Sequence, residues 1–534
     1  MRGVGMRAVL IVKSFLCLWL MIASSAAQCP SAAFSPSDVL QNFDQNTVTD
    51  RLAEHIASLD EKVPALFQGY GIDVHAVTVV YGNTTIYSTG MVDTPFRIAS
   101  VTKVFTAMGA LVLRQQGRLA LDDPVKKFLP NFSVINPYGK QHDITLRELM
   151  GHLSGLPREL CAGSIFCGPE DEEDILRFIA KMQLVRPPWS VIPTYSNLGF
   201  AVLGHAWEKA TSPRQSWSEF VRNAILNPLD MHDTGLDFAN VKLAPGNLGP
   251  KYPSNTSIGW VGPTGDMYST ALDLAKFLKF LLKPDEKLLS ETAIREWTKP
   301  TTLFPDTSDP TNIWNGFAMP WELVSLTTTD NQSTTLITKG GAVGTYLSII
   351  ALHPDSQLGV SVLTSSPNTT LGLNGVSYPS VISSAILQDL IPAVQSIHSK
   401  LISSLYSGVY TCKRSQDPMV SPSFANVTYQ VLGGSINVTA MAPGKALVAD
   451  WNITVLQNGV EAHLNYSASL VLKSAAEHSF WAYARSCSLI SAGLSYDVEI
   501  ARPNFPGSVY QSVFRFEPGM KVVRWPGIGA ECYK

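Results

Sequence analysis

The stretch "FRIASVTKVF" (residues 96–105) places a lysine three residues after a serine, at the start of an apolar run. Residues three apart on a helix share a face, so Ser100 and Lys103 are expected to be neighbours at a helix N-terminus. A buried lysine loses hydration, and its neutral form can then take the proton of a serine hydroxyl. The alternative is a capping serine followed by a solvated lysine. This S-x-x-K spacing occurs once in the chain, but the pair alone does not decide between the two.

The composition excludes several classes of protein. The chain has 534 residues, of which 45% are hydrophobic and 16% charged, as expected for a globular protein with more than one domain. A net charge of −3 without a basic cluster argues against nucleic acid as a partner. H-x-H, HExxH, C-x-x-C and G-x-S-x-G patterns are all absent from the sequence, so neither a metal site nor a cofactor is expected, and an α/β-hydrolase is disfavoured.

The first 27 residues resemble a secretory signal peptide. Basic residues precede the apolar run 14–23, and the small residues Ser25 and Ala27 follow it. We expect cleavage after Ala27 and a secreted, extracellular protein. The rival interpretation is a signal anchor, but the apolar run is short for a full membrane span. No stable membrane anchor is therefore expected.

The cysteines and sequons agree with secretion. Six of the seven cysteines follow the expected cleavage site, which suggests three disulfides in an oxidising compartment. Cys161 and Cys167 are the one pair that sequence proximity suggests, as a short loop staple; the remaining pairings stay open. Asn-x-Ser/Thr glycosylation candidates lie at Asn83, Asn131, Asn255, Asn331, Asn368, Asn426, Asn437, Asn452 and Asn465.

Residues 28–398 are predicted to form a mixed domain. Strands around a Gly-Asn turn are expected over 76–90, and further adjacent strands over 334–365. Helices are expected over 101–117, 273–282 and 376–398. Strands near both ends with helices between them indicate an α+β domain whose single sheet uses both ends of the segment.

Residues 399–534 differ in pattern. Short strand-like segments such as "YSGVYTC" (406–412) alternate with turns, and no convincing helix is present. A separate, smaller all-β domain is predicted here.

Two further segments complete a set of motifs. "PTYSNLGF" (193–200) contains Tyr-Ser-Asn, and "ITKGGAVG" (337–344) contains Lys-Gly-Gly on a predicted strand. The order S-x-x-K, Y-x-N, K-x-G resembles the serine β-lactamase and penicillin-binding-protein superfamily, closest to class C β-lactamases and their esterase and D-peptidase relatives. Further stretches fit the same family: "ITLRELMGHLSGLP", "ILNPLDMHDTG", "PTGDMYSTALDLAKFL" and "NGFAMPWELV". The resemblance implies an antiparallel sheet with an all-helical subdomain, and it favours catalysis by Ser100.

The resemblance also implies catalytic roles. Ser100 corresponds to the nucleophile that forms an ester with the acyl group, and Lys103 to the lysine that accepts its proton or tunes its neighbours. Tyr195 corresponds to the tyrosine that relays a proton to the leaving group and helps to activate the deacylating water. Its pKa must fall from about 10 for that role, which requires nearby cations such as Lys103 and Lys339. Asn197 corresponds to the asparagine that binds Lys103 and the substrate.

The third motif implies substrate contacts. Lys339 and Gly341 correspond to substrate-binding positions, and the N–H groups of Ser100 and Ala342 to the oxyanion donors, each worth about 3 kcal/mol in comparable enzymes. Gly340 departs from the threonine or serine common in relatives, whose hydroxyl helps to hold a substrate carboxylate. Esters or neutral amides are therefore expected to be preferred to β-lactams.

The functional alternatives stay open. The leading prediction is a serine hydrolase that acts on a small-molecule or peptide acyl substrate through an acyl-enzyme. An acyltransferase would use the same residues, and a non-catalytic binding or sensor protein could keep the fold. His152 is expected to be structural, because this chemistry needs no histidine. The acidic run "PEDEEDILRF" (169–178) is expected to begin a helix and not to bind a metal.

Overall fold

The computed structural model describes residues 45–139, 142–160, 171–188, 190, 192–211, 213–249, 252–304, 315–366 and 377–406, and from residue 408 onward it describes the backbone of separate strands. The expected signal peptide, the pair Cys161 and Cys167, and the sequons at Asn368 and Asn426 lie outside these residues. The chain divides into two compact units, Asp44–Gln395 and a second one that contains Ser396–Lys534. This division falls close to the expected boundary at residue 398.

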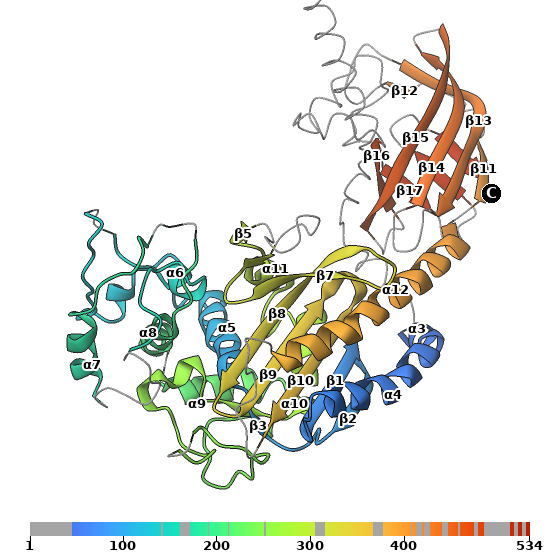
Figure 1. Ribbon diagram of the computed structural model, residues 1–534. Coiled ribbons are helices and arrows are strands. Elements are labelled where there is room, and N and C mark those ends of the chain that lie inside the picture. Colours follow the sequence, from blue (N-terminus) through green and yellow to red (C-terminus); the bar gives the residue numbers. More distant parts are fainter. Residues whose placement is uncertain are drawn as a thin grey trace, which may run out of the picture. The chain divides into compact units, whose positions relative to one another are not determined.

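The first unit is built on one eight-stranded antiparallel sheet with the order β2-β1-β10-β9-β8-β7-β6-β5 (Figure 1). Strand β1, near the start of the unit, pairs with β10, near its end, from Val74↔Ser365 to Tyr81↔Leu358. The expected sheet that uses both ends of the segment is confirmed. The strands are β1 (Val74–Tyr81), β2 (Thr84–Gly90), β5 (Thr302–Phe304), β6 (Asn315–Phe317), β7 (Glu322–Thr327), β8 (Ser333–Val343), β9 (Tyr346–His353) and β10 (Leu358–Ser365).

Helices cover both faces of this sheet. On one face, α4 (Ala53–Gly69) stacks Phe67 on His75 of β1 and is joined to α12 (Tyr378–Tyr406) by an ion pair between Lys62 and Asp389. On the other face, the buried Thr78 of β1 donates a hydrogen bond to the carbonyl oxygen of Ala271, the first residue of α10 (Ala271–Leu282). Side chains alternate between the two faces of a strand, so those of His75 and Thr78, three residues apart, point to opposite faces of the sheet. One face is covered by α4 and α12, and the other by α10.

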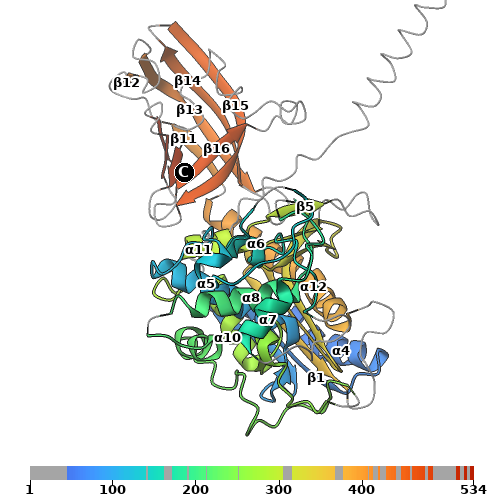
Figure 2. The same ribbon diagram turned by 90° about the vertical axis from the view of Figure 1, so that its left-hand side faces the viewer.

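The remaining helices gather beside the sheet, on the side of α5 (Thr102–Gln115), and face the viewer in Figure 2. They are α6 (Leu146–Met150), α7 (Glu172–Ile179), α8 (Asn197–Glu208) and α9 (Trp217–Val221). Glu296 of α11 (Glu291–Thr298) forms ion pairs with Arg114 of α5 and Arg147 of α6, whereas α3 (Gln45–Arg51) lies elsewhere in the unit. The acidic run does begin a helix: the Asp171 side chain accepts a hydrogen bond from Glu173 N at the start of α7. The α+β class and the helical subdomain are thus confirmed.

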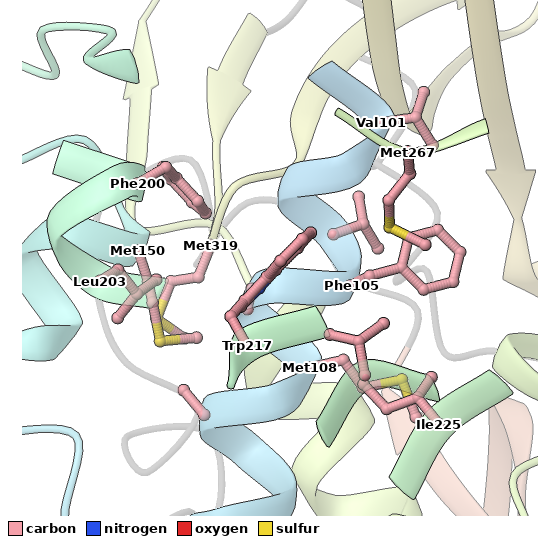
Figure 3. Packing of buried hydrophobic residues seen from close by; sticks show 14 of the residues in the cluster. Val101, Phe105, Met108, Met150, Phe200, Leu203, Trp217, Ile225, Met267 and Met319 are labelled. Atoms are coloured by element: carbon pink, nitrogen blue, oxygen red, sulfur yellow. The ribbon is translucent and has the colours of Figure 1, made fainter. Parts of the chain in front are cut away.

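Helix α5 is buried on all sides. Every residue from Thr102 to Leu113 is buried, although the sequence pattern predicted one apolar stripe. Figure 3 shows the reason: Phe105 and Met108 of α5 pack among side chains from several other segments, including Trp217 and Ile225. A helix held on all sides fixes the position of whatever stands at its N-terminus.

Helix α12 has one further property. Among the described residues it is the one helix whose length and composition, over Tyr378–His398, would suffice to cross a membrane. Half of its most apolar stretch is buried within the structure. Core helices of soluble proteins have the same composition.

The second unit contains a nine-stranded sheet. Its order is β11-β19-β18-β17-β16-β15-β14-β13-β12, and β11 also pairs with β13, so the pairings of all strands except β12 close into a ring. In the register between β11 and β19, Cys412 lies opposite Cys532. The strands are β11 (Gly408–Cys412), β12 (Met419–Val420), β13 (Thr428–Ala440), β14 (Leu447–Gln457), β15 (Val460–Ser474), β16 (Ser479–Ala484), β17 (Val513–Phe516), β18 (Val522–Trp525) and β19 (Ala530–Tyr533).

Candidate active site

Ser100 and Lys103 are in direct contact at the start of α5. Ser100 lies in a 3₁₀ turn, Ala99–Val101, and Lys103 Nζ donates to Ser100 Oγ at 3.0 Å and to the carbonyl oxygen of Thr264 at 2.6 Å. The Lys103 side chain is fully buried, whereas Ser100 stays partly exposed. Within the described residues no side chain caps α5. The interpretation of Ser100 as a cap and Lys103 as a solvated lysine is therefore wrong.

The backbone around the serine is tightly constrained. Ala99 has a φ of +46°, a left-handed conformation that residues with a Cβ rarely adopt. Strand β8 approaches this turn at Gly341, where a Cβ would lie 2.4 Å from the Ile98 carbonyl oxygen and 2.9 Å from Ser100 N. Gly341 is therefore needed because β8 and the serine turn lie in contact.

Tyr195 lies between cations. Its ring centroid is 5.1 Å from Lys103 Nζ, 5.3 Å from Lys339 Nζ and 4.9 Å from the Arg158 guanidinium carbon. Burial raises the pKa of Tyr195, but the charges of Lys103 and Lys339, with a hydrogen bond to Ser100, outweigh it, so the pKa falls below 10. The tyrosinate is thus more accessible than in water, as a proton acceptor requires.

Burial also lowers the pKa of Lys103, and the charge of Lys339 lowers it further. Tyr195 acts in the opposite direction. Since the two side chains interact closely, Lys103 and Tyr195 titrate as a couple. The protonation of one member therefore depends on the charge of the other.

Lys339 is buried and paired. It lies on β8 with 1% of its side chain exposed, and its Nζ is 2.5 Å from Glu322 Oε1 on the neighbouring strand β7. Burial lowers the pKa of Lys339, but Glu322 and Tyr195 more than compensate, and the pKa lies above its ordinary value. Lys339 is therefore a permanent cation of the site.

The two expected oxyanion donors, the N–H groups of Ser100 and Ala342, lie on segments that approach each other closely. Gly340 N–H donates to Glu322 Oε2, so it points toward the β7 edge of β8. Alternate N–H groups of a strand point to the same side, which gives Ala342 N–H the same direction. In the described residues the β7 pairing ends at Glu322↔Thr338, so this N–H lies beyond the last paired residue, and Ala342 is exposed. A Cβ added at its neighbour Gly341 would lie 2.9 Å from Ser100 N, the other expected donor.

Asn197 makes a different contact from the one expected. Its Nδ2 donates to Glu159 Oε1 at 2.6 Å, and the bonds of Lys103 in the described structure go to Ser100 and Thr264 instead. The Oδ1 atom of Asn197 is buried without a hydrogen-bond partner. An unpaired buried acceptor is costly, and the hydrogen bond of Nδ2 to Glu159 is the one recorded for this amide.

His152 has the expected structural contact. Its Nδ1 accepts the N–H of Ser196 at 3.1 Å, and its ring stacks on that of Tyr195 with centroids 4.3 Å apart. Burial, with the charges of Lys103 and Lys339, lowers its pKa well below 6.5. The neutral ring of His152 holds the Tyr195 segment in place.

The structure brings Ser100, Lys103, Tyr195, Lys339, Gly341 and Ala342 together, with Asn197 beside them. Sequence reasoning missed Glu322, although "NGFAMPWELV" was among the family-like stretches, and it missed Glu159 and the Thr264 carbonyl. Among the described residues, no group of three or more His, Cys, Asp or Glu side chains is arranged to hold a metal ion.

A comparison with protein families decides the relationship. The model of the family described as Beta-lactamase matches residues 53–373, more than half of the chain. The chain belongs to the Beta-lactamase family.

Solved structures with a similar fold agree with this family. The octameric penicillin-binding protein homologue from Pyrococcus abyssi has a TM-score of 0.52 at 20% identity, over 80% of this chain and 97% of that one. The Beta-lactamase/D-alanine Carboxypeptidase from Yersinia pestis has a TM-score of 0.51 at 22% identity, over 65% of this chain and 100% of that one. The superfamily resemblance is confirmed, and these structures establish the fold.

Sequence relatives cover part of the chain. Beta-lactamase-like protein 2 of Dictyostelium discoideum is 31% identical over 291 residues, which are 49% of this chain and 52% of the relative. Beta-lactamase-like protein 4 of the same organism is 29% identical over 377 residues, 64% of this chain and 63% of the relative. The chain thus spans between about half and two thirds of the length of these relatives. By family, the chain therefore groups with the beta-lactamase-like serine hydrolases.

Proposed function

We propose that this protein is a serine hydrolase that cleaves an ester or amide through an acyl-Ser100 intermediate. The contact of 3.0 Å between the fully buried Lys103 and Ser100 Oγ carries the proposal. A buried amine on a serine hydroxyl that remains partly exposed is the arrangement that nucleophilic catalysis needs. Tyr195, with its lowered pKa, completes the proton path.

In the first step Ser100 Oγ attacks the carbonyl carbon, and its proton passes to the Lys103–Tyr195 couple. The negative charge that develops on the carbonyl oxygen is stabilised by the N–H groups of Ser100 and Ala342. The bond to the leaving group breaks, and Tyr195 delivers the proton to that group. Water then gives a proton to the Lys103–Tyr195 couple as its oxygen attacks the ester carbon, the bond from carbon to Oγ breaks, and Oγ takes up that proton.

A labelling experiment tests this proposal. A fluorescent fluorophosphonate is expected to label the wild-type protein, and a short neutral nitrophenyl ester is expected to be hydrolysed. Ser100→Ala is expected to lose both while keeping its circular dichroism spectrum. Labelling that does not depend on Ser100 would refute the assignment. Stoichiometric acylation without turnover would favour the binding or sensor alternative, and ester formation with added methanol would reveal acyl transfer.

The proposed enzyme is secreted. The basic, apolar and small residues before Gln28 support this, and so do the four sequons in the described part of the first unit, Asn83, Asn131, Asn255 and Asn331, which are all exposed. After expression in eukaryotic cells, we expect N-glycosylated protein in the medium with Gln28 as its first residue. Protein that stays in the membrane fraction would refute this.

A further inference from the structure

Glu322 uses both carboxylate oxygens inside the site. Oε1 lies 2.5 Å from Lys339 Nζ, and Oε2 accepts the N–H of Gly340 at 3.1 Å. A cation beside a free backbone N–H is a common way to bind an anion. Here both donors are already occupied by a carboxylate of the same chain.

The sheet register fixes Glu322 in this place. Glu322 is the first residue of β7 and pairs with Thr338, whose Oγ1 donates to the Glu322 carbonyl oxygen at 3.0 Å. The side chain thus reaches along β8 to the two residues that follow Thr338. The Glu322 side chain is 30% exposed, whereas Lys339 is 1% exposed, so the carboxylate lies between the buried cation and solvent.

The space beside Gly340 does not explain why a carboxylate would be excluded. A Cβ at residue 340 would meet Glu322 Oε2 at 3.6 Å and the Ser348 carbonyl oxygen at 4.0 Å, both ordinary contact distances. A small hydroxyl side chain would fit. The obstacle for an anionic substrate is therefore the charge of Glu322, because a second carboxylate at the same cation is repelled.

We infer that Glu322 determines the substrate class of this site: its carboxylate fills the anion subsite formed by Lys339 and Gly340 N–H, so the site accepts acyl substrates that are uncharged there. This inference rests on the proposed hydrolase function. Its consequence is specific: removal of one negative charge, with the shape kept, opens the site to carboxylates.

Glu322→Gln is the variant that tests this inference. Two matched substrate pairs are compared: 4-nitrophenyl butyrate with 4-nitrophenyl glutarate, and phenyl butyrate with 3-carboxyphenyl butyrate. These pairs place a carboxylate in the acyl group or in the leaving group. In at least one pair, the variant is expected to raise the anionic-to-neutral ratio of kcat/KM by about 10- to 100-fold, the effect of one hydrogen bond to a charged group. Unchanged ratios in both pairs would overturn the inference.

Glu159→Gln is the matched control. Glu159 is also a carboxylate at the site, but it contacts Asn197, and its removal tests whether any loss of negative charge is enough. We expect its ratios to stay within about 3-fold of wild type, because the recorded contacts of Glu159 are with Asn197 and Arg158, not with Lys339 or the Gly340 N–H. Equal ratio changes in the two variants would overturn the role of Glu322.

A binding measurement separates this inference from the hydrolase proposal. Calorimetric titration with benzoate is carried out in Ser100→Ala and in Ser100→Ala with Glu322→Gln, so turnover plays no part. Benzoate is expected to bind at least about tenfold more tightly to the double variant. If the wild-type protein does not turn over an ester, the hydrolase proposal fails, but this comparison still decides on Glu322. Equal affinities in folded proteins would refute the subsite.

Discussion

Lys103 Nζ lies 3.0 Å from Ser100 Oγ, and the lysine side chain that makes this contact is fully buried. A packed helix core would not place a cation there, since burying a charge costs several kcal/mol unless it is paired. Its partners include the serine hydroxyl, the backbone carbonyl of Thr264 and the Tyr195 side chain, and the described hydrogen bonds of Lys103 include none to a carboxylate. Burial lowers the pKa of Lys103, so this arrangement favours a lysine that can give up its proton.

Tyr195→Phe is expected to lower kcat for a neutral amide by about 100-fold or more, since general acid–base catalysis contributes about that much. The ring should keep its stacking on His152, so the fold is expected to be retained. Steady-state kinetics and thermal unfolding of both proteins check the two halves of this prediction. Wild-type rates on an amide would remove Tyr195 from the proton path.

The pH dependence of kcat/KM should follow the pKa of Tyr195. Burial raises this pKa, Lys103 and Lys339 lower it by more, and Glu322 raises it slightly. Because the base must be deprotonated, activity is expected to rise with pH through that lowered pKa, below 10. Lys339→Met removes a lowering charge and should move the acidic limb to higher pH. Glu322→Gln removes a raising charge and should move it to lower pH. Each pH profile is measured with a neutral ester. Shifts of the acidic limb in the same direction in both variants would contradict its assignment to Tyr195.

The two neighbouring glycines of β8 are expected to differ. A Cβ at Gly341 would lie 2.4 Å from the Ile98 carbonyl oxygen, whereas the nearest atom to a Cβ at Gly340 is 3.6 Å away. Gly341→Ala must therefore displace the serine turn or the strand, and we expect a loss of kcat of at least about 100-fold, as for a misplaced catalytic group. Gly340→Ala serves as the control and should stay within about 3-fold. Similar losses in both would show that the close approach is not the cause.

Several elements of the fold could be predicted from the sequence, because they depend on local patterns of residues. Alternating apolar residues and a Gly-Asn turn indicated β1 and β2, and the apolar period of 101–117 indicated α5. The motif order brought Ser100 and Tyr195 together only through the family resemblance.

The contacts that tune the site could not be predicted. Glu322 reaches Lys339 only because β7 and β8 pair in one register, and a shift by one residue would turn its side chain to the other face. The burial of Lys103 depends on helices that cover α5 from every side, which a single-helix pattern cannot reveal. The Thr264 carbonyl is a backbone group, and every residue has one, so the residue type at this position does not indicate the contact.

The buried Arg97–Asp266 ion pair is expected to stabilise the fold of the first unit. Arg97 Nη2 lies 2.6 Å from Asp266 Oδ1, with exposures of 0% and 6%. Arg97→Met leaves Asp266 as an uncompensated buried charge, which should cost about 3–5 kcal/mol of unfolding free energy. The exposed pair of Arg177 and Asp174 on α7 is the control, and Arg177→Met should cost less than about 1 kcal/mol. Denaturant unfolding measures both, and equal costs would count against a structural role for Arg97.

The last prediction concerns cephalosporins, which carry a carboxylate. The missing hydroxyl at Gly340 and the presence of Glu322 both disfavour such substrates. The effect of adding the hydroxyl is expected to depend on whether Glu322 is present. While Glu322 holds Lys339 and the Gly340 N–H, a hydroxyl added at residue 340 has no free cation beside it.

Gly340→Thr alone is therefore expected to leave the ratio of cephalosporin to nitrophenyl-ester turnover within about 3-fold of wild type. Combined with Glu322→Gln, the same threonine should raise that ratio by a further ten- to hundredfold or so, since it then donates to a bound carboxylate beside a free cation. The four proteins form a double-mutant cycle, and the predicted coupling is positive. Additive effects would mean that hydroxyl and carboxylate act independently, and a large gain from Gly340→Thr alone would show that Glu322 does not block the subsite.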